Sequence, residues 1–335
     1  MAVALLFLVA GIIILTFAAD HFVEGAVSVA DVLNISPVVV GALVIGFGTS
    51  LPEMLVSGVA AVQGDADLGV GNVVGSNVAN LTLVLGVAAL ISVISIDSLT
   101  RRRELPLCVG AVLLFAVLVQ DGFRRWEGIV LAVGLVLTLG WLLRNAHDHD
   151  LESPAQTHEG QSALKSSVRT VLGLAGTVGG AWLLVDGGTS LADELGLTGG
   201  FVGLTLVAIG TSLPEMVTAV VAARKGETDL IIGNLLGSNI FNSLAVGAVL
   251  GLLGPGPLED ASLAGLATIV MIGVVLIAAI FLYTGGRVVR WQAATLLLIY
   301  LVSMPFTIST TVDCAEEPEA QECVDSVVAL ALPSG

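Results

Sequence analysis

The chain carries little charge for its size. Only 12% of its 335 residues are Asp, Glu, Lys or Arg, whereas 56% are hydrophobic and the mean hydropathy is +0.99. Because a water-soluble domain usually has about 25% charged residues, this composition excludes that class. Apolar runs of the about 17 to 25 residues that cross a bilayer recur along the whole chain. The sequence therefore predicts an all-α polytopic membrane protein, embedded in a lipid bilayer.

Basic residues are especially scarce. Twelve bases, only two of them lysines, stand against 28 acids, so the formal net charge is -16. Proteins that bind nucleic acid present basic surfaces, so no nucleic-acid partner is expected. No motif indicates a protein partner or a bound cofactor either.

Cysteine and histidine occur three and four times. Cys108 lies in an apolar run, as a small buried hydrophobic residue would. Cys314 and Cys323 bracket an acidic stretch and form a candidate disulfide, although spacing alone does not establish the bond geometry. Most of the histidines lie in a hydrophilic segment, 145–167, which is most simply a solvated connector.

One seven-residue stretch occurs twice. Gly48 to Met54, with the sequence GTSLPEM, recurs as Gly210 to Met216, 162 residues later. Gly71 to Asn80 recurs at the same offset as Gly233 to Asn242, with every polar position retained. The chain is therefore an internal duplication, and the shared polar residues are the candidates for function.

The apolar runs predict ten transmembrane helices, five in each copy. Two copies with an odd number of spans must cross the membrane in opposite directions, which is the inverted-topology plan of many secondary transporters. The predicted spans are about 3–19, 35–62, 69–95, 104–119, 126–143, 168–185, 200–223, 230–253, 262–283 and 291–309. The predicted units are a first five-helix repeat (1–144), a cytoplasmic linker (145–167), a second five-helix repeat (168–310) and an acidic extracellular tail (311–335).

The few basic residues predict the orientation. With the N-terminus outside, ten of the twelve bases fall in inner loops and only Arg124 and Arg125 fall outside. Such an asymmetry is typical of the positive-inside rule. We therefore expect a multi-pass protein of the cell membrane with both termini extracellular and the central linker cytoplasmic.

Glu53 and Glu215 place carboxylates inside predicted spans. A charge at bilayer depth costs about 2.5–3.5 kcal/mol even on the insertion scale, and such residues usually mark ion or substrate paths; packing between helices is the alternative. Pro52 and Pro214 stand next to them. Because proline has no N–H to donate, each should break its helix and free a backbone carbonyl.

Residues four apart share one face of a helix. This spacing joins Thr49 to Glu53 and Ser76 to Asn80, and the second copy repeats both pairs. All these groups offer oxygen, and the motifs contain no Cys or His, so a hard cation fits better than a soft transition metal. One Ca²⁺ and several monovalent cations both satisfy this chemistry. Glycines with small-xxx-small spacing predict the close helix packing that gathers the oxygens, namely Gly71, Gly75, Gly233 and Gly237.

At these residues the chain resembles the sodium/calcium exchanger family, prokaryotic type, within the cation/calcium exchanger superfamily. The resemblance covers both motifs and the ten spans. It implies antiport by alternating access, with Na⁺ entering as Ca²⁺ leaves and the first and sixth helices sliding past the rest. It implies Ca²⁺ ligation by Glu53, Glu215, Thr49 and Thr211. The Na⁺ sites implied are formed by these four residues with Ser50, Ser76, Ser212, Ser238, Asn80, Asn242 and carbonyls near Gly46 and Ala208.

Other functions compete with this one. Some relatives, including potassium-dependent ones, carry an acid where this chain has Asn242, which favours potassium-independent exchange. Proton/calcium antiport is the main alternative, and a passive cation channel is a further one. An intramembrane protease would use an aspartate pair or a Ser/His dyad at depth. No His lies within a predicted span, so the chain is expected not to be an enzyme.

Overall fold

The computed structural model describes residues 2–33, 35–64, 66–120, 122–146, 163–194, 211–258 and 263–308, and these are almost entirely helical. In the first half the helices after α1 (Ala2–Leu33) are α2 (Pro37–Val40), η1 (Gly41–Gly46), α3 (Phe47–Thr49), α4 (Leu51–Gln63), α5 (Ala66–Ala79), η2 (Asn80–Val84), α6 (Leu85–Ile91), α7 (Ser98–Arg102), α8 (Glu104–Leu118) and α9 (Arg125–Arg144). The second half has α10 (Ala163–Glu194), α12 (Leu213–Lys225), α13 (Thr228–Ile240), η4 (Phe241–Val246), α14 (Gly247–Leu253), η5 (Leu263–Ala267), α15 (Thr268–Gly285) and α16 (Arg290–Ile308). Segments labelled η are π-helical.

Five described helical segments are long and apolar enough to cross a membrane: Val3–Leu33, Ala66–Ile91, Arg125–Arg144, Thr228–Leu253 and Leu263–Gly285. A sixth span is the pair Pro37–Thr49 and Leu51–Val62, which bends by 46°. The bend confirms the break predicted at Pro52. This proline lies in the first turn of α4, where its missing N–H is tolerated, so a new helix can begin there.

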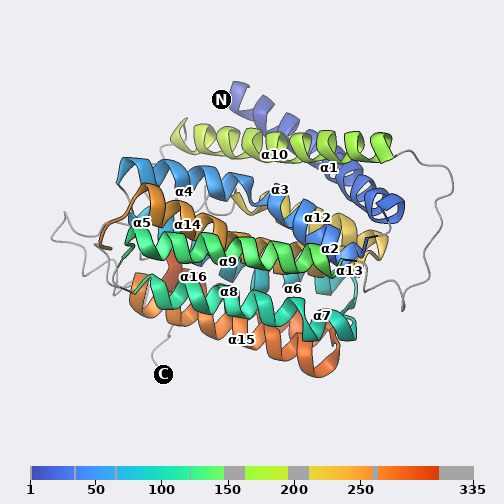
Figure 1. Ribbon diagram of the computed structural model, residues 1–335. Coiled ribbons are helices and arrows are strands. Elements are labelled where there is room, and N and C mark those ends of the chain that lie inside the picture. The colour runs from blue at the N-terminus through green and yellow to red at the C-terminus, as the bar shows by residue number, and fades with distance from the viewer. Residues whose placement is uncertain are drawn as a thin grey trace, which may run out of the picture.

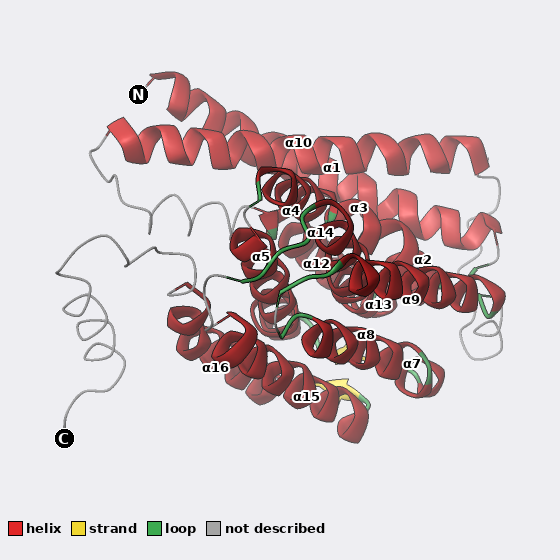
Figure 2. Cartoon of the chain, turned by 60° about the vertical axis from the view of Figure 1, so that its left-hand side comes forward, coloured by secondary structure: helices red, strands yellow, loops and turns green. Residues whose placement is uncertain are grey.

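Helices α1 and α10 form a separate layer on one side of the bundle (Figures 1 and 2). They run antiparallel in very close contact. A Cβ at Gly173 would lie 2.5 Å from the Phe22 nitrogen, and one at Gly180 would lie 2.6 Å from the Leu15 nitrogen. Glycine at these positions therefore lets the two backbones touch, as small residues do in membrane helix pairs.

Helix α1 is much longer than the predicted span of 3–19. It has 32 residues and includes Asp20, Glu24 and Asp31. The helix continues past the predicted end of the span, and two of these acids make ion pairs with another helix. Asp20 and Glu24 pair with Lys225 at the end of α12.

The duplication is visible in the backbone. Helices α6 and α14 have the same length and begin 162 residues apart. Helices α4 and α12 both end at a left-handed glycine, Gly64 with φ 81° and Gly226 with φ 79°. Ser50 and Ser212 precede them with nearly the same dihedrals, φ -83° and -89°. Equivalent residues therefore hold equivalent positions in the two halves.

The two halves also contact each other reciprocally. Strand β1 (Ile94–Ser95), after α6, pairs antiparallel with β2 (Arg287–Val288), before α16. The equivalent loop after α14 makes the bridge between Gly256 and Phe123, before α9. Such an exchange is what a pseudo-twofold relation between the repeats produces.

Helix α13 lies at the centre of the protein, with Leu230 to Ile240 entirely buried. Gly237 contacts the first half so closely that a Cβ would lie 2.5 Å from the Ala42 Cα, and Gly233 makes a similar approach to Val38. Gly75, the twin of Gly237, has nothing within 4 Å of the same position. The predicted close packing is thus confirmed for Gly233 and Gly237. It is wrong for Gly75, because α13 is enclosed by neighbouring backbone at its glycines and α5 is not enclosed at Gly75.

Cys108 is 1% exposed on α8, which confirms the buried hydrophobic role. Three other predictions lie outside the described residues. They are the candidate disulfide of Cys314 with Cys323, most of the linker 145–167 and the tail 311–335.

Candidate functional site

Glu53 and Glu215 lie in the first turns of α4 and α12, and the span that carries Glu53 bends just before it. Their side chains are almost completely buried, with 1% and 0% of their surface exposed. The two carboxylates are close enough to repel each other electrostatically. Two acids on distant parts of the chain thus meet at one buried location, as the duplicated motif predicts.

Hydroxyl groups of each repeat face the carboxylate of the other. The Ser50 hydroxyl donates to Glu215 Oε1 at 3.3 Å. Thr211 and Ser212 face Glu53 in the reciprocal position. Thr49 also faces Glu215. The site is therefore formed between the repeats, and neither half contains it alone.

A second set of contacts joins η1 and α3 to α13. Thr49 Oγ1 lies 3.2 Å from Asn234 Oδ1 and 2.9 Å from the Ile45 carbonyl. Ser238 Oγ lies 3.3 Å from the Gly46 carbonyl and 3.4 Å from Asn234 Oδ1. The Gly46 carbonyl also accepts a hydrogen bond from the Ser50 N–H. This predicted ligand is thus already engaged by two protein donors.

The two asparagines predicted as ligands lie in π-helical segments. Asn80 begins η2 and Asn242 lies in η4, and both are fully buried. Segment η2 packs against α12, which carries Glu215, and η4 packs against α4, which carries Glu53. A π-helical turn widens a helix locally and occurs frequently at functional sites. Each amide therefore lies in a π-helical segment that packs against the helix carrying the other repeat's acid.

Several buried polar atoms of this region have no hydrogen-bond partner among the described residues. They are both carboxylate oxygens of Glu53, Glu215 Oε2, both amide atoms of Asn80 and of Asn242, and Ser212 Oγ. Leaving a buried polar group unsatisfied is costly, and an ion or water that binds there is the usual explanation. Carboxylate, amide and hydroxyl oxygens suit a hard cation.

Few negatively charged side chains are available to bind such a cation. No cluster of three or more His, Cys, Asp or Glu occurs in the described part of the chain. Two carboxylates would therefore be completed by neutral oxygens, which matches one divalent ion in charge. Ser76, another predicted ligand, is 4% exposed on α5. Ala208 and Gly210 lie outside the described residues.

Two asparagines of the motif were not among the predicted site residues. Asn234 Oδ1 lies within hydrogen-bond distance of both Thr49 and Ser238. Its twin Asn72 donates to the Glu53 carbonyl at 3.1 Å and to Ser57 at 2.9 Å. Their retention in both copies of the motif was the available signal, but helical spacing did not place them beside the acids.

Comparison with known proteins gives consistent matches. The family model for sodium/calcium exchanger proteins matches residues 3–144 and 165–309. CaxA of Alkalimonas amylolytica is 38% identical over 311 residues, covering 90% of this chain and 97% of CaxA. The sodium/calcium exchanger MaX1 of Methanosarcina acetivorans is 34% identical, covering 88% of this chain and 96% of MaX1.

Solved structures match the fold as well. The sodium-calcium exchanger NCX_Mj soaked with 10 mM Na⁺ and no Ca²⁺ superimposes with a TM-score of 0.82 at 32% identity, covering 91% of this chain and 98% of that one. With 2.5 mM Na⁺ and 0.1 mM Ca²⁺ the TM-score is 0.81 at 31% identity, covering 90% and 97%.

Proposed function

Because the chain belongs to the sodium/calcium exchanger family, we propose that it is an antiporter that exports Ca²⁺ in exchange for Na⁺ entry. The observation that carries this proposal is the pair of buried carboxylates, Glu53 and Glu215, held between two repeats, with three of their four oxygens lacking a hydrogen-bond partner among the described residues. A site at the interface of two inverted repeats can open to either side when one group of helices moves against the rest.

For Ca²⁺ we propose ligation by Glu53 and Glu215, assisted by Thr49 and Thr211. The two negative charges neutralise one divalent ion, and calcium tolerates irregular oxygen cages. Na⁺ would use overlapping oxygens, since a shared ligand set makes the two ions compete. The proposed Na⁺ ligands are these four residues with Ser50, Ser76, Ser212, Ser238, Asn80, Asn242 and the carbonyls of Gly46 and Ala208.

We further propose ten spans in two inverted five-helix repeats, 1–144 and 168–310, joined by a cytoplasmic linker. Both termini, and with them the acidic tail, would be extracellular. The reciprocal pairing of Ile94 with Val288 and of Phe123 with Gly256 supports the inverted relation. The distribution of basic residues supports the orientation.

Alternating access would come from the α1–α10 layer. These helices make their most extensive contacts with each other. The layer meets the site through α3, where a Cβ at Gly48 would lie 2.7 Å from the Leu174 side chain on α10. Sliding of α1 and α10 would therefore change the access to one side of the site. The central helices would keep the ion-binding residues in place.

Calcium-45 flux in proteoliposomes tests the proposal. A Na⁺, H⁺ or K⁺ gradient is imposed in turn, with the other ions held equal. Sodium-driven uptake is expected, whereas uptake driven by H⁺ alone would establish proton/calcium antiport instead. Calcium flux that persists without any counter-ion gradient would indicate a passive channel.

A further inference from the structure

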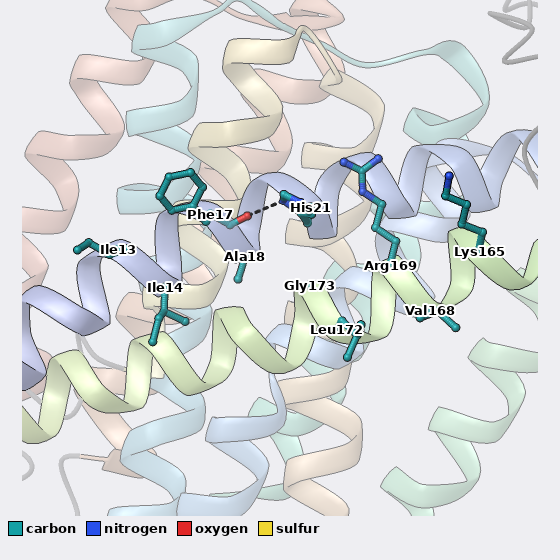
Figure 3. A pocket seen from close by; sticks show the side chains of 10 residues that line it. All are labelled: Ile13, Ile14, Phe17, Ala18, His21, Lys165, Val168, Arg169, Leu172 and Gly173. Atoms are coloured by element: carbon teal, nitrogen blue, oxygen red, sulfur yellow. Dashed lines mark hydrogen bonds between the residues drawn. The ribbon is translucent and has the colours of Figure 1, made fainter.

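A groove runs along the outer face of the α1–α10 layer, away from the candidate site. It encloses about 790 Å³ between the two helices (Figure 3). Its apolar part is formed by Ile13, Ile14 and Phe17 of α1 and Leu172 of α10. Phe17 and Leu172 are both 67% exposed. In a membrane-embedded helix pair, such side chains contact lipid chains.

Basic side chains line one end of this α1–α10 groove. Lys165 and Arg169 extend from α10 to the same side, and His21 lies beside them on α1 (Figure 3). Phe17 and Ile13 lie further toward the start of α1. No acidic residue lines the groove among those described. The groove is therefore amphipathic along its length, basic at one end and apolar beyond.

Ion pairs with residues that do not line the groove fix Arg169 at its basic end. Arg169 is paired with Glu24. Lys225 of α12 lies 2.7 Å from both Asp20 Oδ1 and Glu24 Oε1, so the two acids are already engaged by a base outside the groove. Among the described residues of this cluster, three bases (Lys165, Arg169 and Lys225) stand against two acids (Asp20 and Glu24). This set of described side chains is therefore positive, although the whole chain carries -16.

We propose that the α1–α10 groove binds one anionic phospholipid, with its phosphate at Lys165 and Arg169 and an acyl chain along Phe17 and Leu172. The charge of the basic end complements a phosphodiester, and the adjoining apolar surface complements a hydrocarbon chain. Basic pockets between helices at a membrane face bind anionic headgroups in this way. A soluble anion would use only the basic end and leave the apolar part without a ligand.

The site can be tested by native mass spectrometry of the full chain in detergent. The protein is titrated with phosphatidylglycerol or with phosphatidylcholine of identical acyl chains. We expect one tight phosphatidylglycerol site that Lys165→Gln weakens about fivefold, since a base near a membrane surface contributes about 1 kcal/mol and 1.4 kcal/mol is tenfold. Phe17→Ala should weaken binding of both lipids.

Arg224→Gln is the matched control, because it removes an equal charge from an exposed position outside the groove. This variant should bind phosphatidylglycerol as the wild type does. Equal affinity for the two lipids, or unchanged binding in Lys165→Gln, would overturn the proposal. Displacement of phosphatidylglycerol by millimolar inorganic phosphate would show that a free anion, and not a lipid, is the ligand. Because lipid binding is measured directly, failure here would leave the transport proposal untouched.

Discussion

The Ser50 hydroxyl donates a hydrogen bond to Glu215 Oε1 at 3.3 Å, although 165 residues separate the two in the chain. Ser50 directly precedes α4 of one repeat, and Glu215 lies in the first turn of α12 of the other. The reciprocal relation places Ser212 and Thr211 opposite Glu53. Each carboxylate therefore faces hydroxyl groups of the other repeat.

Replacing either acid with its amide should stop exchange. Glu53→Gln and Glu215→Gln are each expected to weaken Ca²⁺ binding by about 10- to 100-fold, because contacts with a charged group contribute about 1.5–3 kcal/mol. Sodium-driven calcium-45 uptake measures the effect. Glu127→Gln is the control, since this acid caps the start of α9, where its Oε2 accepts from the Arg124 N–H. Near-normal uptake in either site variant would refute the ligand assignment.

The cross-repeat hydrogen bond should matter less than the acids. Ser50→Ala removes the donor to Glu215, which is worth about 1 kcal/mol, so we expect roughly fivefold weaker apparent Na⁺ or Ca²⁺ affinity. Concentration dependence of exchange in proteoliposomes gives the value. Thr177→Val is the matched control, because that buried hydroxyl donates to the Gly173 carbonyl of its own helix and to no other group among the described residues. An equal effect in both variants would mean that the loss is structural.

Asn242→Asp adds a third carboxylate to the buried region. Because the amide is fully buried beside the helix of Glu53, a new charge should change which ion drives exchange, toward K⁺ or H⁺, and leave the fold intact. Flux under separate Na⁺, H⁺ and K⁺ gradients measures this. Asn80→Asp, its twin, should behave similarly if the site is pseudo-symmetric. Unchanged dependence on all three ions in Asn242→Asp would contradict the role of that position.

Two equivalent glycines should respond differently to the same substitution. Gly237→Ala places a Cβ 2.5 Å from the Ala42 backbone, so overpacking should destabilise the protein by about 1–3 kcal/mol. Gly75→Ala meets nothing within 4 Å and replaces a poor helix former, so it should be neutral or stabilising by up to about 1 kcal/mol. Thermal unfolding in detergent compares them. A similar loss of stability in both would show that the α13 packing is not the cause.

Local features were predictable where local chemistry determines them. Pro52 cannot complete the hydrogen bond of a continuous helix, and the structure bends by 46° there. The burial of Glu53 and Glu215 followed from acids within apolar runs, and the family followed from the repeated motifs. These properties depend on residue type and spacing, which the sequence contains directly.

Features that depend on distant neighbours were not predictable. The sequence around Gly75 does not distinguish it from Gly237. The two glycines differ only in what surrounds them in space, because α13 is enclosed. The ion pairs of Asp20 and Glu24 with Lys225 join α1 to another helix that is some 200 residues away in the chain. Asn234 joins the site through Thr49, whose hydroxyl lies 3.2 Å from Asn234 Oδ1 although 185 residues separate the two in the chain.

By itself the sequence determined a membrane protein built from two related halves, each with one buried acid beside a helix break. Apolarity, proline and duplication specify these features without reference to any other part of the chain. Tertiary structure alone decided that the acids of the two halves face each other's hydroxyls. That arrangement depends on how the repeats pack, and packing energies come from contacts between residues that the chain separates by more than 160 positions.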